Sequence, residues 1–337
     1  MTAGEPLLKV DDLAVAFKTR RGLAHAVRGV SYEVRPGESL AIVGESGSGK
    51  SVSAMALLGL LPRSAQVTGS AVFQGEDLIG MSNEKLRHIR GGAVSMIFQD
   101  PMTAFNPVFT IGDQIIEAIR AHDRSVSKKA GAERTMELFA MVGIPEPRRR
   151  LHQYPHEFSG GMRQRAMIAM AMANNPVLLI ADEPTTALDV TIQAQVMEAL
   201  VAVQAETGAA MLLITHDLGL VAGFADRVQV MYGGRLFETS DTRTVFYRSR
   251  NPYTLGLLNS IPRLDDPHGT RLVPIPGTPP SVTNILEGCA FAPRCPYATE
   301  VCLERPAELV PVGPDHWSRC HNLHLLPPVD DRREVGA

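Results

Sequence analysis

One glycine-rich loop indicates the fold of this chain: Gly44-Glu45-Ser46-Gly47-Ser48-Gly49-Lys50-Ser51. It fits the phosphate-binding pattern G-x-x-x-x-G-K-[ST] at every fixed position. The apolar run 40–43 before it predicts a buried strand, and the run 53–58 after it predicts a helix. In a strand–loop–helix unit of this kind, backbone N–H groups and the helix N-terminus bind phosphate. The sequence therefore predicts a nucleoside triphosphate site, in which Lys50 reaches the β- and γ-phosphates and Ser51 ligates Mg²⁺.

Two further apolar runs end in polar residues. The run 177–181 reads as a parallel strand buried on both faces and ends in Asp182-Glu183, and the run 211–214 ends in Thr215-His216-Asp217. Ligands of α/β folds bind at the carboxyl ends of parallel strands, so these groups are expected beside the phosphates. Asp182 is a candidate metal ligand, Glu183 a candidate base for the attacking water, and His216 a candidate contact to the γ-phosphate. Solvated acids and a structural histidine are the alternatives.

Residues from about 7 to 240 resemble the ATP-binding cassette (ABC) ATPases, the engine subunits of ABC transporters. Six places match in order: the Walker A loop 44–51, the Q-loop glutamine Gln99, the signature Ser159-Gly160-Gly161, the Walker B pair Asp182 and Glu183, the D-loop Ala187-Leu188-Asp189, and the switch histidine His216. The resemblance implies an α/β P-loop NTPase fold with a RecA-like core and a helical subdomain. It also implies that ATP and Mg²⁺ bind, that Ser51, Gln99 and Asp182 serve the metal, and that Lys50, Gln99, Glu183 and His216 serve hydrolysis.

The signature departs from the usual L-S-G-G-Q, because Phe158 replaces Leu and Met162 replaces Gln. The motif works through Ser159, backbone N–H groups and a helix N-terminus, so its chemistry is expected to survive. The resemblance implies that it contacts the γ-phosphate held by a second cassette, so that ATP joins the two and hydrolysis releases them. Phe17 is the candidate for stacking on adenine, with a place in a strand core as the alternative.

Composition narrows the class of protein. The chain has 337 residues and a net charge of −3, which gives no electrostatic case for a nucleic-acid partner. No apolar run approaches the roughly 18–20 residues that span a bilayer, and the first six residues lack the layout of a signal peptide. A cytosolic chain is expected, and the membrane-spanning parts of a transporter would be separate polypeptides.

Three regions are expected along the chain. Residues 1–250 form the ABC ATPase domain, within which 102–175 is a helical subdomain that includes an amphipathic helix over 111–119. A later helix is expected to be capped by Asp189 and to stop at Gly208. Residues 251–326 form a Cys-rich, Pro-rich extension with an extended arm at 274–280, and 327–337 form a disordered tail.

All four cysteines lie in this extension, at Cys289, Cys295, Cys302 and Cys320. Cytosolic thiols stay reduced, which disfavours a disulfide, and spacings of five, six and seventeen intervening residues are unlike those of zinc knuckles. Four thiolates in a loop-rich segment suit an iron–sulfur cluster, which would also stabilise a segment with little apolar core. Zinc and free buried thiols are the alternatives.

A narrower resemblance covers residues 251–320. The runs 251–253 and 288–296 and the late Cys320 resemble the C-terminal extension of dipeptide/oligopeptide ABC transporter ATPases, and the runs 99–107 and 160–165 fit the same subfamily. This implies a [4Fe–4S] cluster with a structural role and a subunit whose ATP hydrolysis energises peptide import. The implied partners are a second ABC ATPase subunit in a heterodimer, two transmembrane permease subunits and an extracytoplasmic peptide-binding protein. The implied location is peripheral, at the cytoplasmic face of the plasma (inner) membrane.

Other functions fit the same motifs. Related systems import nickel, haem or glutathione with the same engine. A soluble ABC ATPase of DNA repair or translation is disfavoured, because such proteins usually carry two fused cassettes or a long coiled coil, and this sequence shows neither. A redox sensor that gates ATP hydrolysis is a further interpretation of the cysteine segment.

Overall fold

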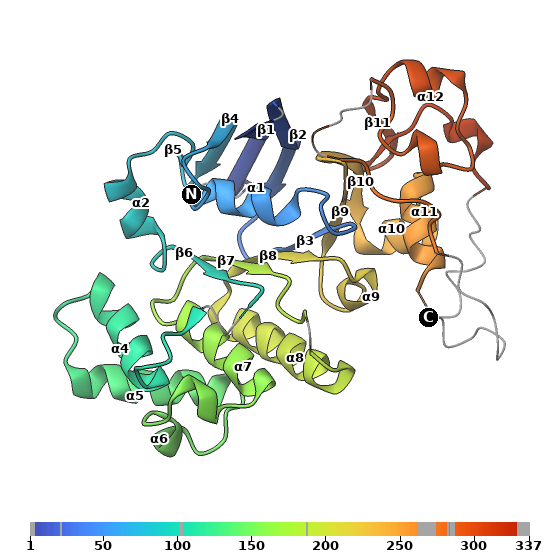
Figure 1. The fold of residues 1–337 in the computed structure, drawn as a ribbon. Coiled ribbons are helices and arrows are strands. Elements are labelled where there is room, and N and C mark those ends of the chain that lie inside the picture. The colour runs from blue at the N-terminus through green and yellow to red at the C-terminus, as the bar shows by residue number, and fades with distance from the viewer. Residues whose placement is uncertain are drawn as a thin grey trace. The chain divides into compact units, whose positions relative to one another are not determined.

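The structure is a computed structural model that describes residues 4–20, 22–100, 104–186, 188–261, 274–281, 283 and 287–328. The chain folds into two compact units. The first comprises residues 1–7, 34–39 and 80–214, and the second comprises 8–33, 40–79 and 215–337. The segment that follows residue 250 thus belongs to the same unit as the glycine-rich loop, and the domain boundary expected there stays a prediction. Figure 1 shows the elements of both units.

In the described part of the first unit, three parallel strands lie side by side in the order β6 (Val94–Ile97), β7 (Leu178–Asp182) and β8 (Ala210–Thr215). Ile97 pairs with Ala181, and Asp182 pairs with Ile214. Every residue of β7 and β8 is buried, which explains why both strands appear in the sequence as continuous apolar runs. The two strands predicted there are confirmed to within one residue at each end.

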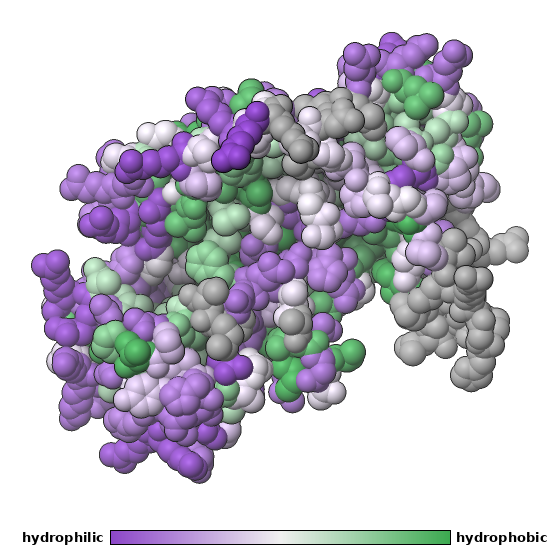
Figure 2. Space-filling model, in the orientation of Figure 1, coloured by the Kyte–Doolittle hydropathy of each residue, from purple (hydrophilic) through white to green (hydrophobic). Residues whose placement is uncertain are grey.

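Helices make up most of the rest of the first unit. Their bounds are α2 (Asn83–Ile89), α4 (Ile111–His122), α5 (Lys128–Met141), α6 (Pro147–Arg150), the 3₁₀ helix η1 (Pro155–Glu157), α7 (Gly160–Ala171) and α8 (Val190–Thr207). The side chain of Asp189 caps α8 by accepting from the N–H of Ile192, and Gly208 ends it at a φ of 67°. Both predicted ends are confirmed, as is the helix over 111–119. Helices α4, α5 and α7 pack on one another (Figure 1), and the surface over α4 to α6 is mainly hydrophilic (Figure 2).

The second unit contains two sheets. In one, β3 (Ser39–Val43) pairs in parallel with β9 (Arg227–Tyr232), and β10 (Arg235–Asp241), β12 (His316–Arg319) and β11 (Leu309–Gly313) continue it in antiparallel fashion. The other is antiparallel around β1, in the order β2 (Gly22–Val34), β1 (Leu8–Thr19), β4 (Ala65–Phe73) and β5 (Glu76–Asp77). All five residues of β3 are buried, so the strand predicted before the loop is confirmed.

The described helices of the second unit have at most eight residues. Their bounds are α1 (Lys50–Leu57), α9 (Leu218–Val221), α10 (Thr242–Arg248), α11 (Pro252–Asn259), α12 (Glu300–Glu304), and the 3₁₀ helices η2 (Ala292–Arg294) and η3 (Leu323–Leu325). Residues 274–280 are neither helix nor strand, as their prolines predict. The ring of Tyr232 packs against those of Phe237, Tyr253 and Phe291, with centroids 4.5–5.4 Å apart. This aromatic cluster is the core that joins the β9–β10 hairpin to the segment after residue 250.

Candidate functional site

The glycine-rich loop runs from the end of β3 to the start of α1. Gly44, Gly47 and Gly49 have φ values of 153°, 80° and 102°, which side chains rarely tolerate. A Cβ atom at Gly44 would lie 2.1 Å from the carbonyl oxygen of Met231, and one at Gly49 would lie 2.3 Å from that of Ala26. Glycine is therefore needed at Gly44 and Gly49 for both conformation and close approach.

The side chain of Lys50 is buried and binds the backbone of this loop. Its Nζ donates to the carbonyl oxygens of Gly44 at 2.7 Å and Glu45 at 3.0 Å, and the residue is only 4% exposed. Ser51 follows it, half-buried in the first turn of α1, and Gly49 is the N-cap of that helix. A buried ammonium group beside the N-terminus of a helix favours an anion. The loop thus has the geometry that phosphate binding requires.

Glu45 has partners that the sequence did not predict. Its backbone N–H donates to the hydroxyl of Tyr253 at 2.8 Å, and its carboxylate pairs with both terminal nitrogens of Arg294, at 2.6 and 2.8 Å. These hydrogen bonds hold the pKa of Arg294 above its usual range. Ser46, which follows Glu45, is exposed, whereas Ser48 is buried.

The predicted acidic residues Asp182 and Glu183 lie in the first unit. Asp182 ends β7 and is 5% exposed, and Glu183 follows with a left-handed φ of 46°. The Glu183 N–H donates to the Ile214 carbonyl at 2.8 Å, which holds this unusual backbone conformation in place. Gln99 Nε2 donates to Glu183 Oε2 at 3.0 Å, and Thr186 Oγ1 donates to the same oxygen at 2.8 Å. The structure thus brings the predicted Q-loop glutamine to the predicted base.

The signature segment is ordered around a helix cap. Ser159 precedes α7 and its Oγ accepts from the N–H of Met162 at 3.3 Å. A Cβ atom at Gly161 would lie 2.5 Å from Cγ2 of Ile192, so α7 and α8 are in close contact there. Gly160 at the start of α7 is less crowded, because a Cβ atom there would lie 3.7 Å from Cδ2 of Leu188. Ser159 is exposed and so is accessible to another molecule.

Two further predicted residues have roles that depend on a bound nucleotide. His216 follows β8 and is exposed, and Phe17 lies half-buried on β1 opposite Ala65. Their roles at the γ-phosphate and the adenine stay predictions. Within the D-loop, Asp189 serves as the cap of α8. Outside the described residues lie Ala187 of that loop and Pro101, Met102 and Thr103 of the run after Gln99.

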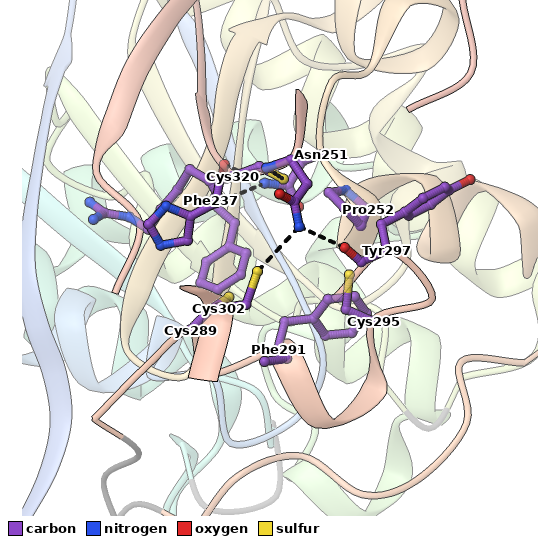
Figure 3. A pocket seen from close by; sticks show the side chains of 13 residues that line it. Phe237, Asn251, Pro252, Cys289, Phe291, Cys295, Tyr297, Cys302 and Cys320 are labelled. Atoms are coloured by element: carbon purple, nitrogen blue, oxygen red, sulfur yellow. Dashed lines mark hydrogen bonds between the residues drawn. The ribbon is translucent and has the colours of Figure 1, made fainter. Parts of the chain in front are cut away.

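The four cysteines line one cavity in the second unit, which holds about 320 Å³ of empty space, part of it open to solvent. Figure 3 shows the sulfurs of Cys289, Cys295, Cys302 and Cys320 around this cavity, together with Phe291. We call it the cysteine cavity. Among the described residues, no group of three or more His, Cys, Asp or Glu side chains is arranged to hold a metal ion.

Nitrogen donors point at two of these sulfurs. The side-chain amide of Asn322 donates to Sγ of Cys302 at 3.4 Å, and its backbone N–H donates to Sγ of Cys320 at 3.3 Å. Asn322 is itself held, because its amide also donates to the carbonyl of Tyr297 at 2.7 Å. N–H donors of this kind stabilise negative charge on sulfur. Asn322 was not predicted from the sequence, since a lone asparagine carries no spacing signal.

Burial raises the pKa of three of these thiols. The pKa of Cys295 and that of Cys320 rise to about 11 each, and the pKa of Cys289 also rises. Burial is the main cause, and the neighbouring cysteines add to it. These thiols are therefore protonated near neutral pH, and a bound metal would have to displace their protons.

Two models of known protein families match this chain. A family model described as ABC transporter matches residues 27–186, and one described as the oligopeptide/dipeptide transporter C-terminal region matches residues 237–302. Together with the relatives below, these matches define the class: the chain belongs to the family of ABC transporter ATP-binding proteins. The predicted α/β cassette fold is thereby confirmed. No described helix is both long and apolar enough to cross a membrane.

Within that family, the chain is similar to proteins named for peptide transport. It is 54% identical over 321 residues to the oligopeptide transport ATP-binding protein OppD of Mycobacterium tuberculosis, and the match covers 95% of this chain and 52% of the relative. The chain thus spans about half the length of that curated relative. It is 53% identical over 300 residues to the dipeptide transport ATP-binding protein DppD of Bacillus subtilis, covering 88% of this chain and 89% of the relative.

A solved structure agrees with the fold. The ATP-binding cassette MJ0796, in a dimeric post-hydrolysis state bound to ADP and phosphate, aligns with a TM-score of 0.63 and 26% sequence identity. The alignment covers 70% of this chain and 99% of MJ0796. The structural likeness is thus that of the cassette.

Proposed function

We propose that this chain is the ATP-hydrolysing subunit of a transporter that imports oligopeptides or dipeptides. The main support for this proposal is the glycine-rich loop, to whose backbone the buried Lys50 side chain donates, because that geometry suits the phosphates of a nucleotide. The relatives named for oligopeptide and dipeptide transport, one of them matched over 89% of its length, support the cargo class. The matched C-terminal region at 237–302 supports the same branch.

Nucleotide binding is assigned to the loop and to the metal ligands. Lys50 and the backbone N–H groups of the loop bind the phosphates, and Phe17 stacks on the adenine. Ser51, Gln99 and Asp182 offer the hydroxyl, amide and carboxylate oxygens that Mg²⁺ accepts. A bound Mg²⁺ ion would neutralise charge on the phosphates.

Hydrolysis is assigned to Glu183. Its carboxylate takes a proton from the attacking water, and the hydrogen bond from Gln99 orients that carboxylate. His216 donates a hydrogen bond to the γ-phosphoryl group as negative charge develops there. Ser159, Gly160 and Gly161 contact the nucleotide of a second cassette, which fits the exposure of Ser159.

The partners proposed here are those that the resemblance to peptide transporters implies. The second cassette is a different subunit, so the working engine is a heterodimer, and two membrane permease subunits and an extracytoplasmic peptide-binding protein complete the transporter. The chain acts at the cytoplasmic face of the plasma membrane. The dimeric state of MJ0796 supports the pairing of cassettes.

Reconstitution tests this function. The chain is co-purified with its membrane subunits, inserted into liposomes, and supplied with ATP, the binding protein and either a dipeptide or a hexapeptide. We expect peptide to stimulate the release of phosphate from ATP. We also expect peptide to accumulate on the side of the membrane where ATP is hydrolysed, and Lys50→Ala to abolish both effects. Stimulation by nickel, haem or glutathione in place of peptide would overturn the cargo assignment. A chain that purifies as a soluble monomer, with no membrane subunit bound, would overturn transport.

The cysteine-rich segment 251–326 is assigned to an extension that holds a [4Fe–4S] cluster. Four sulfurs that line one cavity and two N–H donors aimed at those sulfurs support this assignment. A single zinc ion needs four sulfurs about 2.3 Å from one point, whereas each thiolate of a cluster binds its own iron. A bound cluster would cross-link the parts of the chain that carry the four cysteines.

Metal analysis tests the cluster. Protein purified without oxygen should be brown and contain iron and acid-labile sulfide in equal amounts, about four of each per chain. Cys302→Ser should lose most of both, whereas Thr283→Ser, an exposed change in the same extension, should retain them. Colourless protein with one zinc ion per chain would establish the zinc alternative, and protein with neither metal would refute the site.

A further inference from the structure

An arginine of the C-terminal segment holds the second residue of the glycine-rich loop. Arg294 lies at the end of η2 and directs both terminal nitrogens at the carboxylate of Glu45, at 2.6 and 2.8 Å. The Arg294 side chain is 5% exposed and that of Glu45 is 26% exposed. A two-pronged ion pair is directional, and the burial of Arg294 reduces the screening of its charge by water.

Arg294 is itself fixed in place. Its Nε donates to the carbonyl of Pro276 at 2.7 Å, and Nη1 also donates to the hydroxyl of Tyr232 at 3.0 Å. The guanidinium lies 5.7 Å from the ring centre of Tyr232 and 5.9 Å from that of Phe291. Because these contacts already order the side chain, little rotational freedom is lost when it binds Glu45.

Glu45 is thereby held at three points. Besides the carboxylate, its backbone N–H donates to Tyr253 at 2.8 Å and its carbonyl accepts from Lys50 at 3.0 Å. Tyr253 is fully buried in α11, also within the C-terminal segment. The segment after residue 250 thus fixes the position of Glu45, near the start of the loop that contains Lys50.

The charge of Glu45 gives this contact a consequence for nucleotide binding. Glu45 is the single acid in the run 44–51, and a carboxylate beside a triphosphate repels it. Arg294 neutralises that carboxylate through its two hydrogen bonds. Without Arg294, the loop would offer the phosphates an uncompensated negative charge.

We propose that Arg294 is a positioning residue for ATP hydrolysis, which acts through Glu45 by cancelling its charge and fixing the first turn of the phosphate loop. This rests on the proposed ATPase function. The C-terminal segment is therefore part of the machinery that sets the affinity for ATP. Its contribution is larger for nucleotides with more phosphate charge.

A charge-removal cycle in the assembled transporter tests the proposal. We expect Arg294→Gln to raise the KM for ATP about tenfold, equal to about 1.4 kcal/mol, and to change kcat by less than about threefold. Adding Glu45→Gln should return KM to within about threefold of the value for Glu45→Gln alone, because no unpaired charge is left. The loss of affinity in Arg294→Gln should decrease from ATP to ADP to AMP.

The matched control is Arg250→Gln. Arg250 donates to the carbonyls of Leu323 at 2.6 Å and Pro327 at 3.2 Å, so it supports the same segment without touching the loop. Its KM for ATP should stay at the wild-type value. If Arg294→Gln does not fold, Arg294→Lys keeps the charge without the two-pronged contact, and its KM should rise about threefold.

Several results would overturn the proposal while leaving the ATPase function intact. These are an unchanged KM in Arg294→Gln or Arg294→Lys, a double variant no better than Arg294→Gln, an equal effect in Arg250→Gln, or equal losses for ATP and AMP. A wild-type complex that does not hydrolyse ATP would instead refute the ATPase function itself.

Discussion

Replacing Glu183 by glutamine separates its chemical role from its structural one. Glu183 Oε2 accepts hydrogen bonds from Gln99 at 3.0 Å and Thr186 at 2.8 Å, and an amide oxygen accepts the same two. The change therefore removes the charge and the basicity and keeps the local contacts. Weakening two charge-assisted hydrogen bonds to neutral ones should cost about 1 kcal/mol of unfolding free energy, so the variant should fold.

The effect on catalysis should be much larger. A positioned general base contributes about 10²- to 10⁴-fold, so we expect kcat of Glu183→Gln to fall by about that factor while the Kd for ATP changes less than about threefold. The assembled transporter should then accumulate ATP between paired cassettes. Single-turnover hydrolysis of radiolabelled ATP measures the first effect, and retention of unhydrolysed nucleotide after gel filtration measures the second.

Glu146 provides a matched control for this experiment. It also has a left-handed backbone, with φ of 51°, and it forms an exposed ion pair with Arg149 at 3.1 Å at the start of α6. Glu146→Gln removes the same charge from the same backbone conformation, and its kcat should match that of the wild type. A kcat of Glu183→Gln within about tenfold of wild type, with normal ATP affinity, would show that another group is the base.

Three further predictions follow from the geometry. Lys50→Ala removes the buried ammonium and should lower ATP affinity about 100-fold in a nucleotide titration; a change below about threefold would exclude Lys50 as a phosphate ligand. Gly161→Ala places a Cβ atom 2.5 Å from Ile192 and should lower the unfolding free energy by about 1–3 kcal/mol in urea melts, with partial recovery on adding Ile192→Ala. In metal-free protein, the pKa values of Cys295 and Cys320 are raised to about 11, against 9.0 in the unfolded chain. As pH rises, the unfolded state therefore loses these protons before the folded state does. The free energy of unfolding should fall as pH rises from about 9 toward 11, and it should stay level below pH 9. Urea melts at pH 8 and 10 measure this, and the loss should shrink when both cysteines are replaced by serine.

Local patterns account for the parts of the fold that the sequence predicted. Strands β3, β7 and β8 are buried on both faces, so each appears as a continuous apolar run that needs no tertiary information. The two ends of α8 could be predicted from the sequence because Asp189 and Gly208 act on the backbone within a few residues of themselves.

Contacts between distant residues account for most of what the sequence did not predict. The pair of Arg294 and Glu45 spans 249 positions, and an ion pair has no periodicity or spacing that reveals it. The cysteine cavity was accessible to prediction because four residues of one rare type cluster in one segment. The donors that Asn322 supplies to its sulfurs were not, since asparagine is common in turns.

The unusual signature sequence is consistent with an intact helix cap. Phe158 is 3% exposed and its ring lies 6.5 Å from that of Phe139, so this position fills the core of the helical region rather than facing another molecule. Met162 contributes its backbone N–H to the Ser159 cap, a contact that any residue except proline can make. The two departures therefore fall where a side chain either packs inward or is not needed by the cap. The groups predicted to contact a partner's phosphate are the Ser159 hydroxyl and the first N–H groups of α7, and both departures leave these groups in place. A chain with Phe158→Leu and Met162→Gln should therefore hydrolyse ATP at the wild-type rate.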